Sequence, residues 1–204
     1  MTPTAPTSRQ EAAALLLEVL VEACPAGEVC LIGSLATPGR ADAFSDIDLT
    51  WTIPPEEAAE QLRSLRPTLR RCGEVESLRA DPEPRPDSRL VFARFHGWPL
   101  WWRVDLEVHA PGVGSVGVPG ADPWSPHESA CMGVVVTLKA LARDRPEEAE
   151  ALWARALHRV DAGDVDGDWK TRVRALLDHL ASSGPPMAAL VPRTRRLSSE
   201  VLGE

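Results

Sequence analysis

The feature that most constrains this chain is a pair of aspartates one residue apart, Asp46 and Asp48, inside the segment 45–49 (Ser-Asp-Ile-Asp-Leu). Successive side chains of a strand point to opposite faces, so the two aspartates share one face and the apolar residues share the other. Like charges this close repel each other, and a divalent cation bound by both carboxylates removes the repulsion. The segment therefore predicts a strand that carries part of a metal–nucleotide site.

A second segment, residues 101–109, alternates strictly between apolar and polar side chains. Its apolar face holds Val104, Leu106 and Val108, and its polar face holds Arg103, Asp105, Glu107 and His109. If this strand lies beside the first, three or four carboxylates share one face. Two Mg²⁺ ions about 3.5–4 Å apart need about that many ligands.

The turn-forming pair Gly33-Ser34, the later Asp46-x-Asp48 and a further strand bearing Asp105 together resemble the polymerase-β-type nucleotidyltransferase superfamily. Within it, the resemblance is closest to the small antibiotic-modifying and minimal nucleotidyltransferases. Eleven residues (35–45) separate Ser34 from Asp46, one more than is usual in that pattern. The resemblance covers residues 28–109 and says little about 110–204.

The resemblance implies a magnesium-dependent enzyme that transfers a nucleoside monophosphate, most simply AMP from ATP, to a hydroxyl of a small molecule such as an aminoglycoside or a sugar. Asp46, Asp48 and Asp105 would bind two Mg²⁺ ions, and catalysis would consist mostly of positioning and charge stabilisation. Glu107 is a candidate general base. Which of Asp105 and Glu107 binds metal and which acts as the base stays open.

Four further residues are assigned to the nucleotide: Gly33, Ser34, Ser45 and Lys139. Gly33 lets the backbone turn tightly against a phosphate, and Ser34 offers a hydroxyl and an amide, joined by helix amides if a helix begins there. Lys139 lies in an otherwise apolar helix, where a lysine usually extends to the surface; a phosphate contact is the alternative. Arg103 shares the face of Asp105 and would either neutralise phosphate charge or pair with an acid.

Two other functions compete with small-molecule modification. The first is a minimal nucleotidyltransferase that modifies a partner protein, as in toxin–antitoxin pairs. The second is a catalytically silent nucleotide-binding module. Acidic residues outnumber basic ones 30 to 22, which argues against a nucleic-acid partner and suits a cationic acceptor. An oligomer is compatible with the sequence.

No apolar run approaches the ~18 residues of a membrane span, and the N-terminus lacks a secretion signal, so a cytoplasmic protein without a membrane partner is expected. The cysteines at 24, 30, 72 and 131 show no C-x-x-C spacing, which argues against a zinc site. Their apolar surroundings predict reduced thiols buried in the core.

These patterns predict an α+β fold, with a nucleotidyltransferase core built on a mixed β-sheet with flanking helices, followed by a C-terminal helical domain. The expected parts are a disordered N-terminus (1–7), a nucleotidyltransferase domain (8–110), a Gly/Pro-rich linker (111–126), a helical domain (127–183) and a tail (184–204) with at most a short helix at its end. Capping boxes at Ser8–Glu11 and Ser125–Glu128 predict the starts of two helices.

Overall fold

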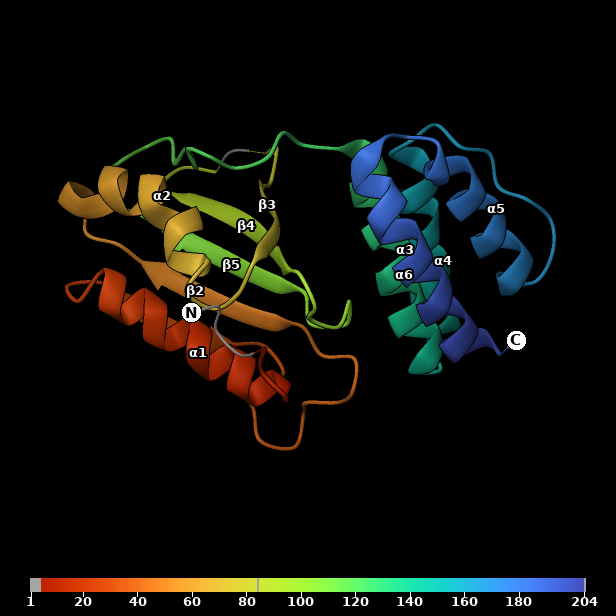
Figure 1. Cartoon of the computed structure of the whole chain (residues 1–204), viewed down its shortest axis with the longest axis horizontal. Helices are drawn as coiled ribbons and strands as arrows, with labels where there is room; N and C mark the ends of the chain where they lie inside the picture. Colours follow the sequence, from red (N-terminus) through yellow and green to blue (C-terminus); the bar gives the residue numbers. More distant parts are fainter. Residues whose placement is uncertain (1–4, 84, 204) are drawn as a thin grey trace. The chain divides into compact units, whose positions relative to one another are not determined.

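The computed structural model describes residues 5–83 and 85–203, which form an α+β structure with a five-stranded mixed sheet and six helices in the described ranges (Figure 1). The chain divides into two compact units, and the boundary between them in the sequence falls between Trp124 and Ser125. Of the residues expected to be disordered, 1–4 lie outside the described part. Thr7 is hydrogen-bonded through its amide and its hydroxyl to Glu11.

The first unit contains every strand and two helices. Its elements in chain order are α1 (Arg9–Ala23), β1 (Glu28–Ile32), β2 (Ile47–Thr52), α2 (Pro55–Leu69), β3 (Val75–Ala80), β4 (Ser88–Phe95) and β5 (Val104–His109). The second unit contains α3 (Pro126–Ala142), α4 (Pro146–His158), α5 (Trp169–Ala181) and α6 (Pro185–Leu202). No helix in the described ranges is both long and apolar enough to cross a bilayer.

The sheet has the order β1-β2-β5-β4-β3. Strands β2 and β5 pair in parallel. The elements α2, β3 and β4 lie between them in the chain and return it to the end of the sheet where β2 begins. The other three strand pairings are antiparallel. The parallel register aligns Asp48 with Asp105 and Thr50 with Glu107. The topology therefore places the two acidic segments side by side at the centre of the sheet.

One face of the sheet is covered by α1 and α2 and forms the core of the first unit (Figure 1). The alternating apolar residues of β2 and β5 point into this core and are at most 1% exposed: Ile47, Leu49, Trp51, Val104, Leu106 and Val108. Burying each such side chain contributes roughly 1.5–3 kcal/mol. The opposite face of both strands is consequently left to their polar residues.

Both predicted capping boxes begin helices. Ser8 Oγ accepts a hydrogen bond from the amide of Glu11 at the start of α1, and Ser125 Oγ accepts one from the amide of Glu128 at the start of α3. Each bond satisfies an amide that has no partner within its helix. Pro126 occupies the first helical position, where its missing amide hydrogen costs nothing.

In the second unit, α3 packs closely against α4. A Cβ added at Gly133 of α3 would lie 2.7 Å from the Cβ of Ala156, so the two backbones approach to a distance that only glycine permits. Helix α3 is buried along most of its length, and its buried polar residues include Thr137, Lys139 and Glu128.

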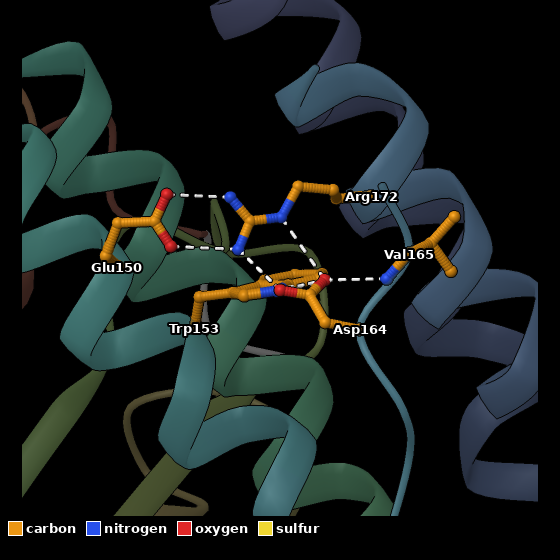
Figure 2. A network of polar contacts seen from close by, with 5 residues as sticks. All are labelled: Glu150, Trp153, Asp164, Val165 and Arg172. Carbon is orange, nitrogen blue, oxygen red and sulfur yellow. Dashed lines mark hydrogen bonds and ion pairs between the residues drawn. The ribbon is translucent and has the colours of Figure 1, made fainter. Parts of the chain in front are cut away.

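A polar network joins α4 to α5 and to the loop between them (Figure 2). The Arg172 guanidinium donates to both carboxylate oxygens of Glu150 at 2.7 and 2.8 Å and to Asp164 at 2.7 Å. Asp164 also accepts from the indole nitrogen of Trp153 at 3.0 Å and from the amide of Val165. The segment Asp161–Asp168 contains four acids, and one of them, Asp164, is bound by Arg172.

Three sequence predictions about the fold are wrong. Residues 185–202 form one helix, not a tail with a short helix, because Met187, Leu190, Val191 and Leu197 give it a buried stripe. Cys30 is exposed, because it lies on edge strand β1 and faces away from the core. The strand predicted over residues 101–109 begins only at Val104, because the Trp102 amide bonds to the Pro99 carbonyl in a turn.

Candidate functional site

The candidate site is a group of carboxylates on the face of the sheet opposite α1 and α2. Asp48 and Asp105 are direct register partners on parallel strands, which lie about 4.8 Å apart in a sheet. Asp46 precedes β2 by one residue, and its carboxylate lies within 3.7 Å of the Arg103 guanidinium. The three acids predicted to act together therefore come from two adjacent strands.

Arg103 binds this carboxylate group from within the same face. Its Nε and Nη2 donate to the two oxygens of Asp105 at 2.7 and 2.5 Å, a bidentate arrangement. The same Nη2 lies 3.7 Å from Asp46 Oδ2. Because Arg103 and Asp105 are two residues apart at the start of one strand, their side chains project to the same side. Of the two alternatives for Arg103, the structure contains the ion pair with an acid.

The electrostatics of Arg103 follow from these neighbours. Removal from water lowers the pKa of the guanidinium, but the charges of Asp105, Asp46 and, more weakly, Asp48 outweigh this effect and raise the pKa above its usual value. The side chains of Arg103, Asp46 and Asp105 are 26%, 20% and 15% exposed. One permanent positive charge therefore offsets part of a local excess of negative charge.

The chemistry of the donors fits Mg²⁺, a hard cation that binds carboxylate oxygens. As they stand, however, no three histidine, cysteine, aspartate or glutamate side chains in residues 5–83 and 85–203 are grouped closely enough to hold a metal ion. Both oxygens of Asp105 accept hydrogen bonds from Arg103. The residue types therefore suit a metal site, whereas in this structure Asp105 and Asp46 are paired with an arginine.

Gly33 lies at the end of β1 and directly against Asp48. Its φ of +68° belongs to the left-handed region that glycine adopts most easily. A Cβ at this position would lie 3.1 Å from Asp48 Cγ and nearer still to Oδ2. The turn at Gly33 thus brings the backbone of the Gly-Ser pair up to one of the predicted metal ligands.

Ser34 is followed by turns, and no helix begins there. The amide and hydroxyl of Thr37 donate to the carbonyls of Ser34 and Gly33 at 3.3 and 3.2 Å, and the next helix starts only at Pro55. Helix amides at Ser34 are therefore not part of the site. The loop contains Pro38 and Gly39, which favour turns over a continuing helix.

Ser45 is buried and fixes the end of the loop that leads to Asp46. Its hydroxyl accepts from the Asp42 amide at 3.0 Å and donates to Asp42 Oδ1 at 3.1 Å. Arg9 of α1 donates to the carbonyls of Asp42 and Ala43 at 2.6 and 2.5 Å. Ser45 and Arg9 therefore position the backbone that precedes Asp46. Arg9 was not predicted, because nothing local to it signals a bond across 33 residues.

Glu107 lies two register pairs further along the sheet than Asp105, opposite Thr50. Its two carboxylate oxygens are each 3.7 Å from a basic side chain, Arg85 on one side and His109 on the other. It is therefore held apart from the Arg103 cluster. Asp105 and Glu107 thus each have basic partners of their own, and which of them would bind metal stays a prediction.

Aromatic side chains flank the carboxylates. Phe44, two residues before Asp46, makes an edge-to-face pair with Trp101, two residues before Arg103, with ring centroids 5.2 Å apart. Both rings are half-buried. Trp98, by contrast, is 3% exposed and stacks on Phe95 within the core, which leaves it no surface for a base or sugar.

Lys139 is not among the residues that the sheet brings together. It lies on α3 in the second unit, and only 3% of the residue is exposed, so the expectation that it extends to the surface is wrong. The apolar helix around it buries most of its positions. A contact between Lys139 and a phosphate stays a prediction from the sequence.

Comparison of the chain with protein-family models, with curated proteins and with solved structures found no match. The interpretation of the site therefore depends on its own residues: three aspartates on adjacent strands, the arginine that binds two of them, and the glycine turn against the third.

Proposed function

We propose that this chain is a magnesium-dependent nucleotidyltransferase that transfers a nucleoside monophosphate, most simply AMP from ATP, to a hydroxyl of a small molecule. The observation that carries this proposal is the register of β2 and β5, which aligns Asp48 with Asp105 beside the Gly33 turn. Residues 57 positions apart in the chain thereby share one sheet face, as a nucleotide–metal site requires.

In this proposal Asp46, Asp48 and Asp105 hold the metal. Magnesium, when bound, would neutralise the triphosphate and orient it for in-line displacement of pyrophosphate. Asp48 and Asp105 come from regular strands that are buried on their other face, and Asp46 directly precedes the first of these strands. Gly33 and Ser34 would offer backbone and hydroxyl groups to the phosphate oxygens. Ser45 supports the loop that leads from Ser34 to Asp46.

Glu107 would accept the proton of the attacking hydroxyl. A general base must reach that proton, and Glu107 shares the face of Asp105 two residue pairs away. His109 and Arg85 would orient its carboxylate. The acceptor is expected to be small and to carry a hydroxyl; a cationic acceptor suits the net charge of −8.

The test is incubation of the whole chain with Mg²⁺ and each nucleoside triphosphate in turn, with and without a panel of aminoglycosides and sugars. Pyrophosphate release and the mass of each acceptor are measured. A mass increase of one nucleoside monophosphate on an acceptor supports the proposal. Mass added to a protein instead would favour the protein-modifying enzyme. If no triphosphate yields pyrophosphate and no Mg²⁺–triphosphate pair stabilises the chain against thermal unfolding, nucleotidyl transfer is rejected.

A further inference from the structure

Arg103 lies where the predicted metal ligands converge. It donates to both oxygens of Asp105 and lies 3.7 Å from Asp46, so one guanidinium bridges two of the three aspartates. Each carboxylate oxygen has two lone pairs, and the bidentate arginine uses one on each oxygen of Asp105. A cation that bound through those same lone pairs would have to replace these hydrogen bonds. Arg103 and a metal ion are therefore competitors for Asp105.

Arg103 also has an aromatic neighbour on the sheet. Its guanidinium carbon is 5.9 Å from the ring of Phe92, which is the register partner of Asp105 on β4. Arginine stacks readily on aromatic faces and binds phosphate oxygens in a bidentate manner. A guanidinium released from Asp105 thus keeps a neighbour on the sheet and can turn toward an anionic ligand.

We propose that Arg103 is a built-in counter-ion that holds the carboxylates together before metal binds, and that it transfers from Asp105 to the triphosphate when metal and nucleotide bind. This inference rests on the proposed function. It makes Arg103 a positioning residue that raises the specificity of the site for the metal–nucleotide pair over the metal alone. Divalent metal without nucleotide binds weakly, because it must displace Arg103 with no phosphate to receive it.

The test measures binding of Mn²⁺, a paramagnetic substitute for Mg²⁺, to the whole chain by electron paramagnetic resonance in the absence of nucleotide. Arg103→Gln removes the competitor, so Mn²⁺ affinity is expected to rise at least tenfold. Arg103→Lys keeps the charge but loses the bidentate geometry, and a smaller rise of at least threefold is expected. The matched control is Arg71→Gln, which removes a positive charge from an exposed ion pair with Glu22 of α1 outside the proposed site, and it should change Mn²⁺ affinity by less than twofold.

The same variants are then titrated with a nucleoside triphosphate in the presence of saturating Mn²⁺. Arg103→Gln should weaken triphosphate binding at least fivefold, opposite in direction to its effect on the metal alone. A residue that only stabilised the fold would not produce opposite changes. Thermal unfolding checks that each variant is folded, and Arg103→Lys carries the test if Arg103→Gln does not fold.

Equal or weaker Mn²⁺ binding by the folded Arg103 variants would overturn the inference. That result is separable from failure of the proposed function, which is measured by pyrophosphate release from the wild-type chain. Turnover by the wild type together with unchanged Mn²⁺ affinity in the variants would reject the role of Arg103 alone. Raised Mn²⁺ affinity in the Arg103 variants, with no turnover by the wild type, would support the counter-ion role of Arg103 and reject nucleotidyl transfer.

Discussion

Gly33 and Asp48 are in such close approach that no side chain fits between them: a Cβ on Gly33 would lie 3.1 Å from Asp48 Cγ. The Asp48 carboxylate is therefore confined on one side by backbone. Because Asp48 is also aligned with Asp105, the conformation of the Gly33 turn is coupled to the geometry of the whole carboxylate group.

Gly33→Ala is expected to displace Asp48 and to lower pyrophosphate release at least tenfold. The alanine also adopts an unfavourable positive φ, which costs roughly 1–3 kcal/mol of stability. Gly39→Ala is the matched control, because Gly39 has a similar φ of +75° in the same loop but nothing within 4 Å of its Cβ position. Both variants should lose stability in urea unfolding, and only Gly33→Ala should lose activity. Equal activity losses would show that strain in the loop, and not the clash with Asp48, is responsible.

Asp46→Asn is expected to lower turnover by a factor on the order of 10²–10³, as the loss of a group that stabilises transition-state charge does. Asparagine keeps the shape of the side chain and removes its charge. The lost ion pair with Arg103 is long, at 3.7 Å, so the change in stability should stay below about 1 kcal/mol. The measurements are pyrophosphate release and thermal unfolding. Asp178→Asn, which removes an exposed ion pair with Arg195 in the second unit, is the control. Wild-type activity in Asp46→Asn would remove the proposed metal role.

Glu107→Gln is expected to lower the rate by roughly 10²–10⁴ without loss of nucleotide binding, because glutamine occupies the same space but cannot accept the proton. Steady-state rates and nucleotide titrations provide the two readouts, with Glu60→Gln on the exposed side of α2 as control. A rate equal to that of the wild type would make Glu107 a bystander.

Much of the fold could be predicted from local patterns. The alternation of apolar residues in 47–52 and 104–109 identified both central strands, since one buried face forces a period of two. The Ser8 and Ser125 caps located two helix starts, because a capping side chain and its amide are three residues apart. Helix α6 was missed because Pro192 and the Gly-Pro-Pro at 184–186 suggested breaks; prolines at a helix start are compatible with it, and the buried stripe outweighs Pro192.

The candidate site was predictable only in part. Simple alternation placed Asp46 and Asp48 on one strand face and Arg103 and Asp105 on another, and pairing of Arg103 with an acid was one of its two predicted alternatives. The parallel pairing of β2 with β5 is non-local and follows from the path through α2, β3 and β4. The bonds from Arg9 to the loop before Asp46 also join distant segments, and no local pattern encodes them.

In the second unit, Arg172→Gln is expected to lower the free energy of unfolding by roughly 1–2 kcal/mol. The guanidinium is 13% exposed and lies 4.2 Å from the ring centroid of Trp169, so most of the loss comes from packing and cation–π contact. Its partners Glu150 and Asp164 are 54% and 44% exposed, and solvent screens these ion pairs. Urea unfolding measures the loss. Arg174→Gln, at an exposed position on the same helix, should change stability by less than about 0.5 kcal/mol.

The same network should make the stability of the wild type depend on pH. The hydrogen bond from Arg172 lowers the pKa of Glu150; for Asp164, burial opposes the lowering, and the hydrogen bonds from Arg172 and Trp153 outweigh it. A carboxyl group with a lower pKa in the folded state stabilises the fold above its unfolded pKa of about 4, and this stabilisation is lost as pH falls through the folded value. The urea midpoint should therefore fall between about pH 5 and pH 3 more steeply in the wild type than in Arg172→Gln. Parallel pH profiles for the two proteins would show that Arg172 does not stabilise the charged forms of these two carboxyl groups in the folded state (Figure 2).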